Sequence, residues 1–200
     1  MKIGKRISRA LFSLKQVKHV LPLDSLRNLY FALIHPHLSY GNLAWGNADK
    51  NVIRKLTLLQ KRAIRTINRS EYNSHTEPKF RSSRIMKLCD LYEYDSLLFM
   101  YDYRANNLPK LFDGHFPLNR DMPSARNTRQ SSLFKIPFMR SNFSRKSPSF
   151  TFPTLWNEWA KRFSDNWNRP QFKRFVKKQI LNGYAEFQSC DNLGCRECHK

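Results

Sequence analysis

Residues 51–68 constrain the fold more than any other stretch, because their apolar side chains recur at the spacing of an amphipathic helix. At 100° steps one stripe holds Val52, Leu56, Leu59, Ala63 and Ile67. Asp49 stands where it can cap the first turn of such a helix. The pattern predicts a helix whose apolar stripe packs against a core.

The polar face of this predicted helix carries only positive charge. No acid lies between residues 51 and 70, so the face lacks the paired charges that usually support an isolated helix. This favours contact with an anion, while an ordinary basic surface helix would show the same pattern. The candidate nucleic-acid-binding residues here are Arg54, Lys55, Lys61, Arg62, Arg65 and Arg69.

Helical spacing recurs along most of the chain. Pro22 ends a first helix, and His35-Pro36-His37 interrupts a second that starts near Leu23, since proline disfavours helical geometry in the residue before it. We expect His-Pro-His to form a turn and not a catalytic site. A short helix is expected over Leu38–Trp45 and closed by Gly46. The remaining expected helices cover residues 3–20, 77–88, 91–106, 154–162 and 170–183.

The fold expected is therefore mostly α, a helical bundle with a loop-rich section and a C-terminal helix. In the loop-rich section Ser132–Ile136 and Ser149–Phe152 resemble strands that could pair as a ribbon. The tyrosines of 91–106 are expected to pack in the core, and Cys89 to be a buried thiol. The expected divisions are a helical domain at 1–116, a basic loop-rich segment at 117–153, C-terminal helices at 154–185 and a Cys-rich tail at 186–200.

Positive charge is the dominant feature of the composition. The net charge is +21, and residues 1–22, 51–70 and 126–150 each contain no acid. A surplus of this size is best tolerated beside a polyanion, so nucleic acid is the expected partner. An anionic membrane surface or an acidic protein is the alternative partner. The simplest interpretation is a generally basic protein without such a partner.

The segment 126–150 combines charge with aromatic rings. Arg126 and Arg129 are further candidates for phosphate contacts, and four phenylalanines between the basic residues could stack on bases. A loop that binds nothing specific fits the composition equally well.

The C-terminal tail has cysteines at a spacing suited to zinc. Cys195 and Cys198 are separated by two residues, and Cys190 and His199 could complete a ligand set. Because His199 adjoins Cys198, the two side chains seldom both reach one ion, and a set of exposed thiols is the alternative. No other cofactor is expected.

Signals for catalysis, membrane spanning and secretion are not found. The sequence has no Gly-rich phosphate loop, no nucleophile elbow and no Asp-Asp pair. The longest apolar run, Leu29–Ile34, is too short to cross a bilayer, and no secretory signal is present. The N-terminus resembles a mitochondrial presequence, although an ordinary helix face explains it equally. We expect an intracellular protein of the nucleus or cytoplasm.

The run from Leu21 to Ile67 resembles the region downstream of the palm in reverse transcriptases of LINE-like, non-LTR retrotransposons, jockey-like and related. The family pattern is roughly L-x2-L-Y-x-S-L-I-x-P-x-L-x-Y, then Trp-Gly, then L-Q-K-R-A-I-R-x-I. Ala32 departs from it where the family has Ser. The matching residues are Leu29, Tyr30, Leu33, Ile34, Pro36, Leu38, Tyr40, Trp45, Gly46, Leu59, Gln60, Lys61, Arg62, Ala63, Ile64, Arg65 and Ile67.

The resemblance implies a thumb and C-terminal part that grips a template–primer duplex of RNA or RNA–DNA hybrid. The family's RNA-directed DNA polymerase depends on palm aspartates that hold catalytic divalent metals. Those aspartates match nothing in this sequence and would lie upstream of Met1, in a palm and fingers portion that would be this chain's partner. No polymerase activity is expected of the chain alone.

Overall fold

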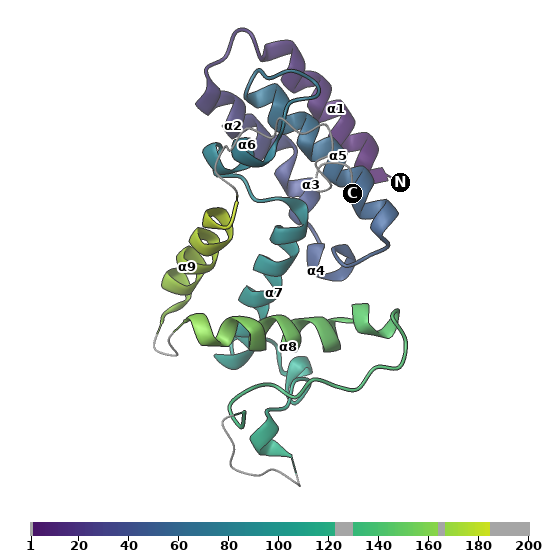
Figure 1. Cartoon of the computed structure of the whole chain (residues 1–200), viewed down its shortest axis with the longest axis vertical. Helices are drawn as coiled ribbons and strands as arrows, with labels where there is room; N and C mark the ends of the chain where they lie inside the picture. The colour runs from purple at the N-terminus through teal and green to yellow at the C-terminus, as the bar shows by residue number, and fades with distance from the viewer. Residues whose placement is uncertain (1, 123–129, 164–166, 185–200) are drawn as a thin grey trace. The chain divides into compact units, whose positions relative to one another are not determined.

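The computed structural model describes residues 2–122, 130–163 and 167–184 (Figure 1). This part of the chain is mostly helical, which confirms the expected fold class. No helix within it is long and apolar enough to cross a membrane. Its α-helices are α1 (Lys2–Val17), α2 (Leu23–Leu33), α3 (His35–Ser39), α4 (Asn42–Trp45), α5 (Lys50–Ile67), α6 (Glu77–Ser82), α7 (Leu88–Arg104), α8 (Pro148–Trp159) and α9 (Arg169–Asn182).

The chain divides into two compact units that are both discontinuous in sequence. Unit 1 comprises Met1–Tyr40, Asp49–Asp90 and Lys178–Lys200, and unit 2 comprises Gly41–Ala48 and Leu91–Lys177. These limits differ from the sequence-based division at residues 116, 153 and 185. Each unit is described by itself.

Helix α5 is the central helix of unit 1, and α1 runs alongside it (Figure 1). Leu56, Ala63 and Ile67 of the predicted stripe are buried, which confirms that the helix is amphipathic. Asp49 caps the helix as expected, since its Oδ1 accepts a hydrogen bond from the Asn51 backbone N–H at 2.8 Å. Side chains of α1, among them Ile7 and Leu14, supply further core residues of unit 1.

Short interruptions of the helical backbone separate α2 from α3 and α3 from α4. The helix ends at Leu33 and α3 begins at His35 with Pro36 in its first turn, a position proline tolerates because that N–H needs no helical partner. The single helix expected over Leu38–Trp45 is instead two. Gly41, at φ +64°, separates α3 from α4 in a left-handed conformation that glycine adopts without steric cost.

Unit 2 has an aromatic core. Phe152, Trp156 and Trp159 of α8 are buried along one helix face, and Phe172 of α9 lies 5.8 Å from Trp156 between ring centroids. The packing role expected for the tyrosines of α7 is confirmed for Tyr92 and Tyr94, which are both buried.

The ribbon predicted from Ser149–Phe152 was wrong. Those residues lie in α8, where Ser147 precedes the helix and Pro148 occupies its first turn. Burial of rings at helical spacing outweighs the strand propensity of the individual residues. Within the described ranges, Leu118 and Phe134 form an isolated antiparallel bridge, and no ribbon accompanies it.

The prediction of a buried thiol at Cys89 was also wrong. Helix α7 begins at Leu88, so Cys89 occupies its first turn, and the residue is exposed. Its Sγ donates to Asp90 Oδ1 at 3.2 Å. Desolvation of the sulfur, and then the Asp90 carboxylate, raise the pKa of this thiol, so it is a poor nucleophile at neutral pH.

Candidate nucleic-acid interface

A basic cavity lies in unit 1, between the last turns of α1 and α5. It has a volume of about 410 Å³. Four cations line it: Lys15 from the last turn of α1, Lys18 from the turn that follows it, and Arg62 and Arg65 from α5. Thr66, Ser70 and Tyr72 complete the lining. Helices α1 and α5 contain no acidic residue. When they pack, their positively charged polar faces therefore lie near each other at the surface of unit 1.

The two aliphatic hydroxyl groups of this cavity already donate to the backbone. Thr66 Oγ1 donates to the Arg62 carbonyl at 2.9 Å, and Ser70 Oγ donates to the Asn68 carbonyl at 3.1 Å. An anion in the cavity would therefore take its hydrogen bonds chiefly from the lysine and arginine side chains.

Positive charge accumulates at the edge of the cavity. Lys79 Nζ donates to Ser74 Oγ at 2.6 Å, and Arg65 Nε donates to the Ser74 carbonyl at 2.9 Å. Desolvation lowers the pKa of Lys79, the charge of Arg65 lowers it further, and Glu71 partly opposes both. Burial is thus the main cause of the lowered pKa of Lys79, and the nearby charge of Arg65 adds to it.

Arg69 has a structural role that the sequence did not indicate. Its Nε donates to the Lys18 carbonyl at 3.0 Å, and its Nη2 donates to the Leu21 carbonyl at 2.8 Å. It therefore holds the turn that joins α1 to α2 and places Lys18 at the cavity.

The other candidates lie at varied positions. Arg54 and Lys55 are exposed on α5 and Lys61 is half-buried, and none of the three lines the cavity. Arg126 and Arg129 lie outside the described residues, as do the proposed zinc ligands Cys190, Cys195, Cys198 and His199. The described residues contain no other group of His, Cys, Asp or Glu suited to a metal ion.

Two features of this region were not predicted. Lys15 and Lys18 belong to an acid-free block that the sequence did reveal, but their convergence with α5 depends on tertiary packing. Gln60 is almost fully buried and bonds to Tyr30, Met86 and Leu88. The sequence feature that could have revealed the buried role of Gln60 is its position, as a polar residue, on the apolar side of the helix.

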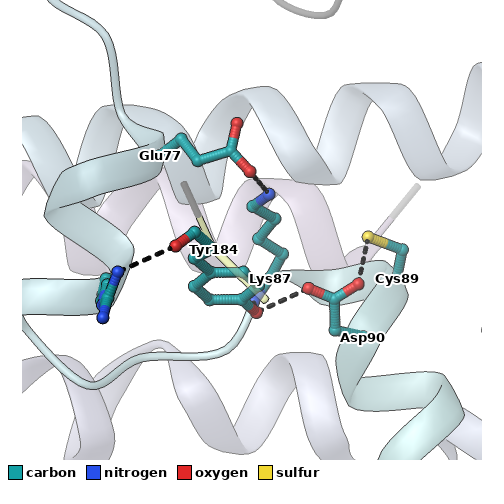
Figure 2. Close-up of polar contacts among 6 residues, drawn as sticks. Glu77, Lys87, Cys89, Asp90 and Tyr184 are labelled. Carbon is teal, nitrogen blue, oxygen red and sulfur yellow. Dashed lines mark hydrogen bonds and ion pairs between the residues drawn. The ribbon is translucent and has the colours of Figure 1, made fainter. Parts of the chain in front are cut away.

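A second polar cluster in unit 1 joins its last described residue to the segment before α7 (Figure 2). The Tyr184 hydroxyl donates to Asp90 Oδ2 at 2.5 Å and accepts from the Lys87 backbone N–H at 2.9 Å. Lys87 Nζ pairs with Glu77, and Arg81 Nη1 donates to the Tyr184 carbonyl at 3.3 Å. Desolvation and the Asp90 charge raise the pKa of Tyr184, so its hydroxyl stays a donor and this cluster is an anchor for the chain.

No protein-family model, curated protein or solved structure matches this chain.

Proposed function

We propose that this chain binds the phosphate backbone of RNA or an RNA–DNA hybrid through the basic cavity of unit 1 and the exposed faces of α1 and α5. The observation that carries the proposal is the convergence of Lys15, Lys18, Arg62 and Arg65 on one cavity. Cations from two helices meet there without a carboxylate among the lining residues.

The physical argument rests on the cost of concentrating like charges. Cations this close repel one another, and a phosphate oxygen that bridges them removes the repulsion and releases condensed counterions from the nucleic acid. Such contacts position a strand without reading its sequence. Binding is therefore sequence-tolerant and weakens steeply with salt.

The proposed biological setting is a retrotransposon reverse transcriptase of the LINE-like, non-LTR class. The residues between Leu29 and Ile67 that match the family pattern support this setting. They include the Leu59–Arg65 segment, which supplies two of the cavity cations. Since the sequence contains no Asp-Asp pair, the proposed role is to grip a template–primer duplex while a palm elsewhere performs the chemistry.

The test is fluorescence anisotropy of the full chain with a labelled RNA–DNA hybrid over a range of salt concentrations. The logarithm of the association constant should fall linearly with the logarithm of salt concentration, with a slope of about −0.9 for each phosphate neutralised. The variant Lys15→Gln/Lys18→Gln/Arg62→Gln should bind more weakly, and the magnitude of its slope should drop by about one for each phosphate that it no longer neutralises.

A matched variant removes the same charge from elsewhere. Lys161, Arg174 and Lys178 are exposed and lie outside the cavity, so Lys161→Gln/Arg174→Gln/Lys178→Gln lowers the net charge equally. It should retain most of the affinity and most of the slope. Equal reductions in the two variants would show that net charge alone drives binding. An affinity for the RNA–DNA hybrid that does not change with salt concentration would refute the proposal.

A further inference from the structure

Two phenylalanine rings of unit 2 are almost fully exposed. Phe138 is 87% and Phe143 is 86% exposed, whereas Phe134, a few residues earlier, is only 2% exposed. Single exposed apolar residues are common on protein surfaces. Two rings this exposed, within one short segment, indicate a surface that a binding partner covers.

The segment that carries these rings is fixed at both ends. At the first end, the Phe134 backbone N–H donates to Asn157 Oδ1 at 3.0 Å, and Asn157 Nδ2 donates to the Phe134 carbonyl at 2.8 Å. At the second end, Asn47 Nδ2 donates to the Lys146 carbonyl at 3.1 Å. The exposed rings therefore belong to an anchored strap, residues 135–146, and not to a chain end.

The backbone around Phe143 is itself hydrogen-bonded. The Ser144 backbone N–H donates to Ser141 Oγ at 3.1 Å, and the Arg145 N–H donates to the Ser141 carbonyl at 3.2 Å. The Lys146 N–H donates to the Phe143 carbonyl at 3.0 Å. This compact turn presents the Phe143 ring outward on a defined backbone, which lowers the ordering cost of binding.

The surroundings of the rings are positively charged. Lys135, Arg140, Arg145 and Lys146 are all exposed, and residues 130–150 contain no acid. Met139, Arg140, Ser141 and Asn142 separate the two rings in sequence, and the exposed Ile136 lies two residues before Phe138. The exposed Arg140 between the two rings suits a strand in which phosphates follow bases, and this charge pattern favours nucleic acid as the occupant of the strap.

We propose that the strap is a stacking platform for single-stranded nucleic acid, with Phe138 and Phe143 each covering the face of a base and the neighbouring cations contacting phosphates. A ring stacks on any base because every base has a π-face, so the site tolerates sequence. In a duplex these faces are already covered by neighbouring base pairs. The platform therefore prefers a single strand, in contrast to the cavity of unit 1, and it stands whether or not that cavity binds a duplex.

The experiment compares a labelled single-stranded RNA with an RNA–DNA hybrid of equal length, bound to the full chain at fixed salt. In Phe138→Ala/Phe143→Ala the affinity for the single strand should fall at least ten-fold, the scale expected when base–aromatic stacking is removed. The affinity for the hybrid should change less than two-fold. Circular dichroism and the thermal midpoint should match the unchanged chain, because both rings are exposed.

Two further variants separate stacking from simple apolar contact. Phe138→Leu/Phe143→Leu keeps apolar side chains but removes the rings, and should weaken single-strand binding nearly as much as the alanine variant. Leu111→Ala, at another exposed apolar residue of unit 2, should leave single-strand affinity unchanged.

Several outcomes would overturn the proposal. Unchanged single-strand affinity in the alanine variant, equal reductions for single strand and hybrid, or full affinity in the leucine variant would each do so. Vesicles of phosphatidylcholine with 30% phosphatidylserine provide a third arm. Sedimentation of the unchanged chain that the alanine variant abolishes, with RNA affinity intact, would assign the strap to a membrane surface instead.

Discussion

Replacing Gln60 with leucine should destabilise unit 1 more than a change at an ordinary helix position. Gln60 is 1% exposed, and its amide makes three hydrogen bonds. Its Nε2 donates to the Tyr30 hydroxyl and to the Met86 carbonyl, both at 2.9 Å, and its Oε1 accepts from the Leu88 backbone N–H at 3.0 Å. Leucine has a similar size and offers none of these partners.

The size of the expected loss in unfolding free energy follows from the polar groups that Gln60→Leu would leave without a hydrogen-bond partner. A net hydrogen bond contributes about 1 kcal/mol, and a buried group left without any partner costs about 1–3 kcal/mol. The Leu88 N–H lies at the start of α7 and the Met86 carbonyl lies two residues before it, and both would lose a partner that is itself buried. We therefore expect Gln60→Leu to lower the free energy of unfolding of unit 1 by about 3–5 kcal/mol.

The assay must report on unit 1 alone. All four tryptophans of the chain lie in unit 2, so tryptophan fluorescence follows that unit. Hydrogen exchange by mass spectrometry on peptides across residues 85–91 and 54–64 reports on unit 1, and the Leu88 amide should lose most of its protection. The exchange rates of the most protected amides of unit 1 give its free energy of unfolding.

Two controls bracket the result. Tyr30→Phe removes one of the three bonds and should cost about 1 kcal/mol, while Leu58→Gln, at an exposed position of the same helix, should cost less than about 0.5 kcal/mol. If Gln60→Leu proved no more damaging than Leu58→Gln, the three bonds would contribute nothing net and the reasoning would be refuted.

Two further predictions concern unit 2. In Gly46→Ala the new Cβ would stand 2.5 Å from Tyr92 Cδ2, so unfolding free energy should fall by about 1–3 kcal/mol, and an unchanged midpoint by tryptophan fluorescence would contradict this. Burial raises the pKa of Asp95, so its carboxyl keeps a proton to higher pH in the folded state than in the unfolded state, and stability falls as pH rises through that range. Asp95→Asn can still accept from Asn42 Nδ2, which donates at 2.9 Å, and should remove that fall; parallel curves of unfolding free energy against pH would contradict it.

The sequence predicted elements whose signals are local. Helix α5 follows from its apolar spacing and from Asp49, and α9 follows from Pro170 near its start and Gly183 after its end. Gly46 was correctly placed at the end of α4, but its φ of −64° is open to any residue. What requires glycine there is the close approach of Asn42 and of Tyr92, and the contact with Tyr92 is one that no local pattern contains.

Where the sequence-based predictions failed, side chains with two competing roles were involved. Phe150 and Phe152 have high strand propensity, and only the burial of Phe152 with Trp156 and Trp159 decides in favour of a helix. Arg69 was expected to face a phosphate, yet its guanidinium is committed to two backbone carbonyls of the α1–α2 turn. The cavity itself depends on the packing of α1 against α5, which determines that Lys15 and Lys18 lie near Arg62.

The anchoring of Tyr184 has a consequence for how the chain can be divided. Unit 1 is assembled from three sequence segments, and Ile180 and Tyr184 are buried parts of it. A truncated chain that ends at Asp90 would leave the Asp90 carboxylate and the Lys87 N–H without the hydroxyl that joins them. A single backbone cut within residues 91–177 would instead leave unit 1 as two peptides that remain joined by noncovalent contacts. A protease cut within unit 2 therefore disturbs unit 1 less than expression of either half of the chain does.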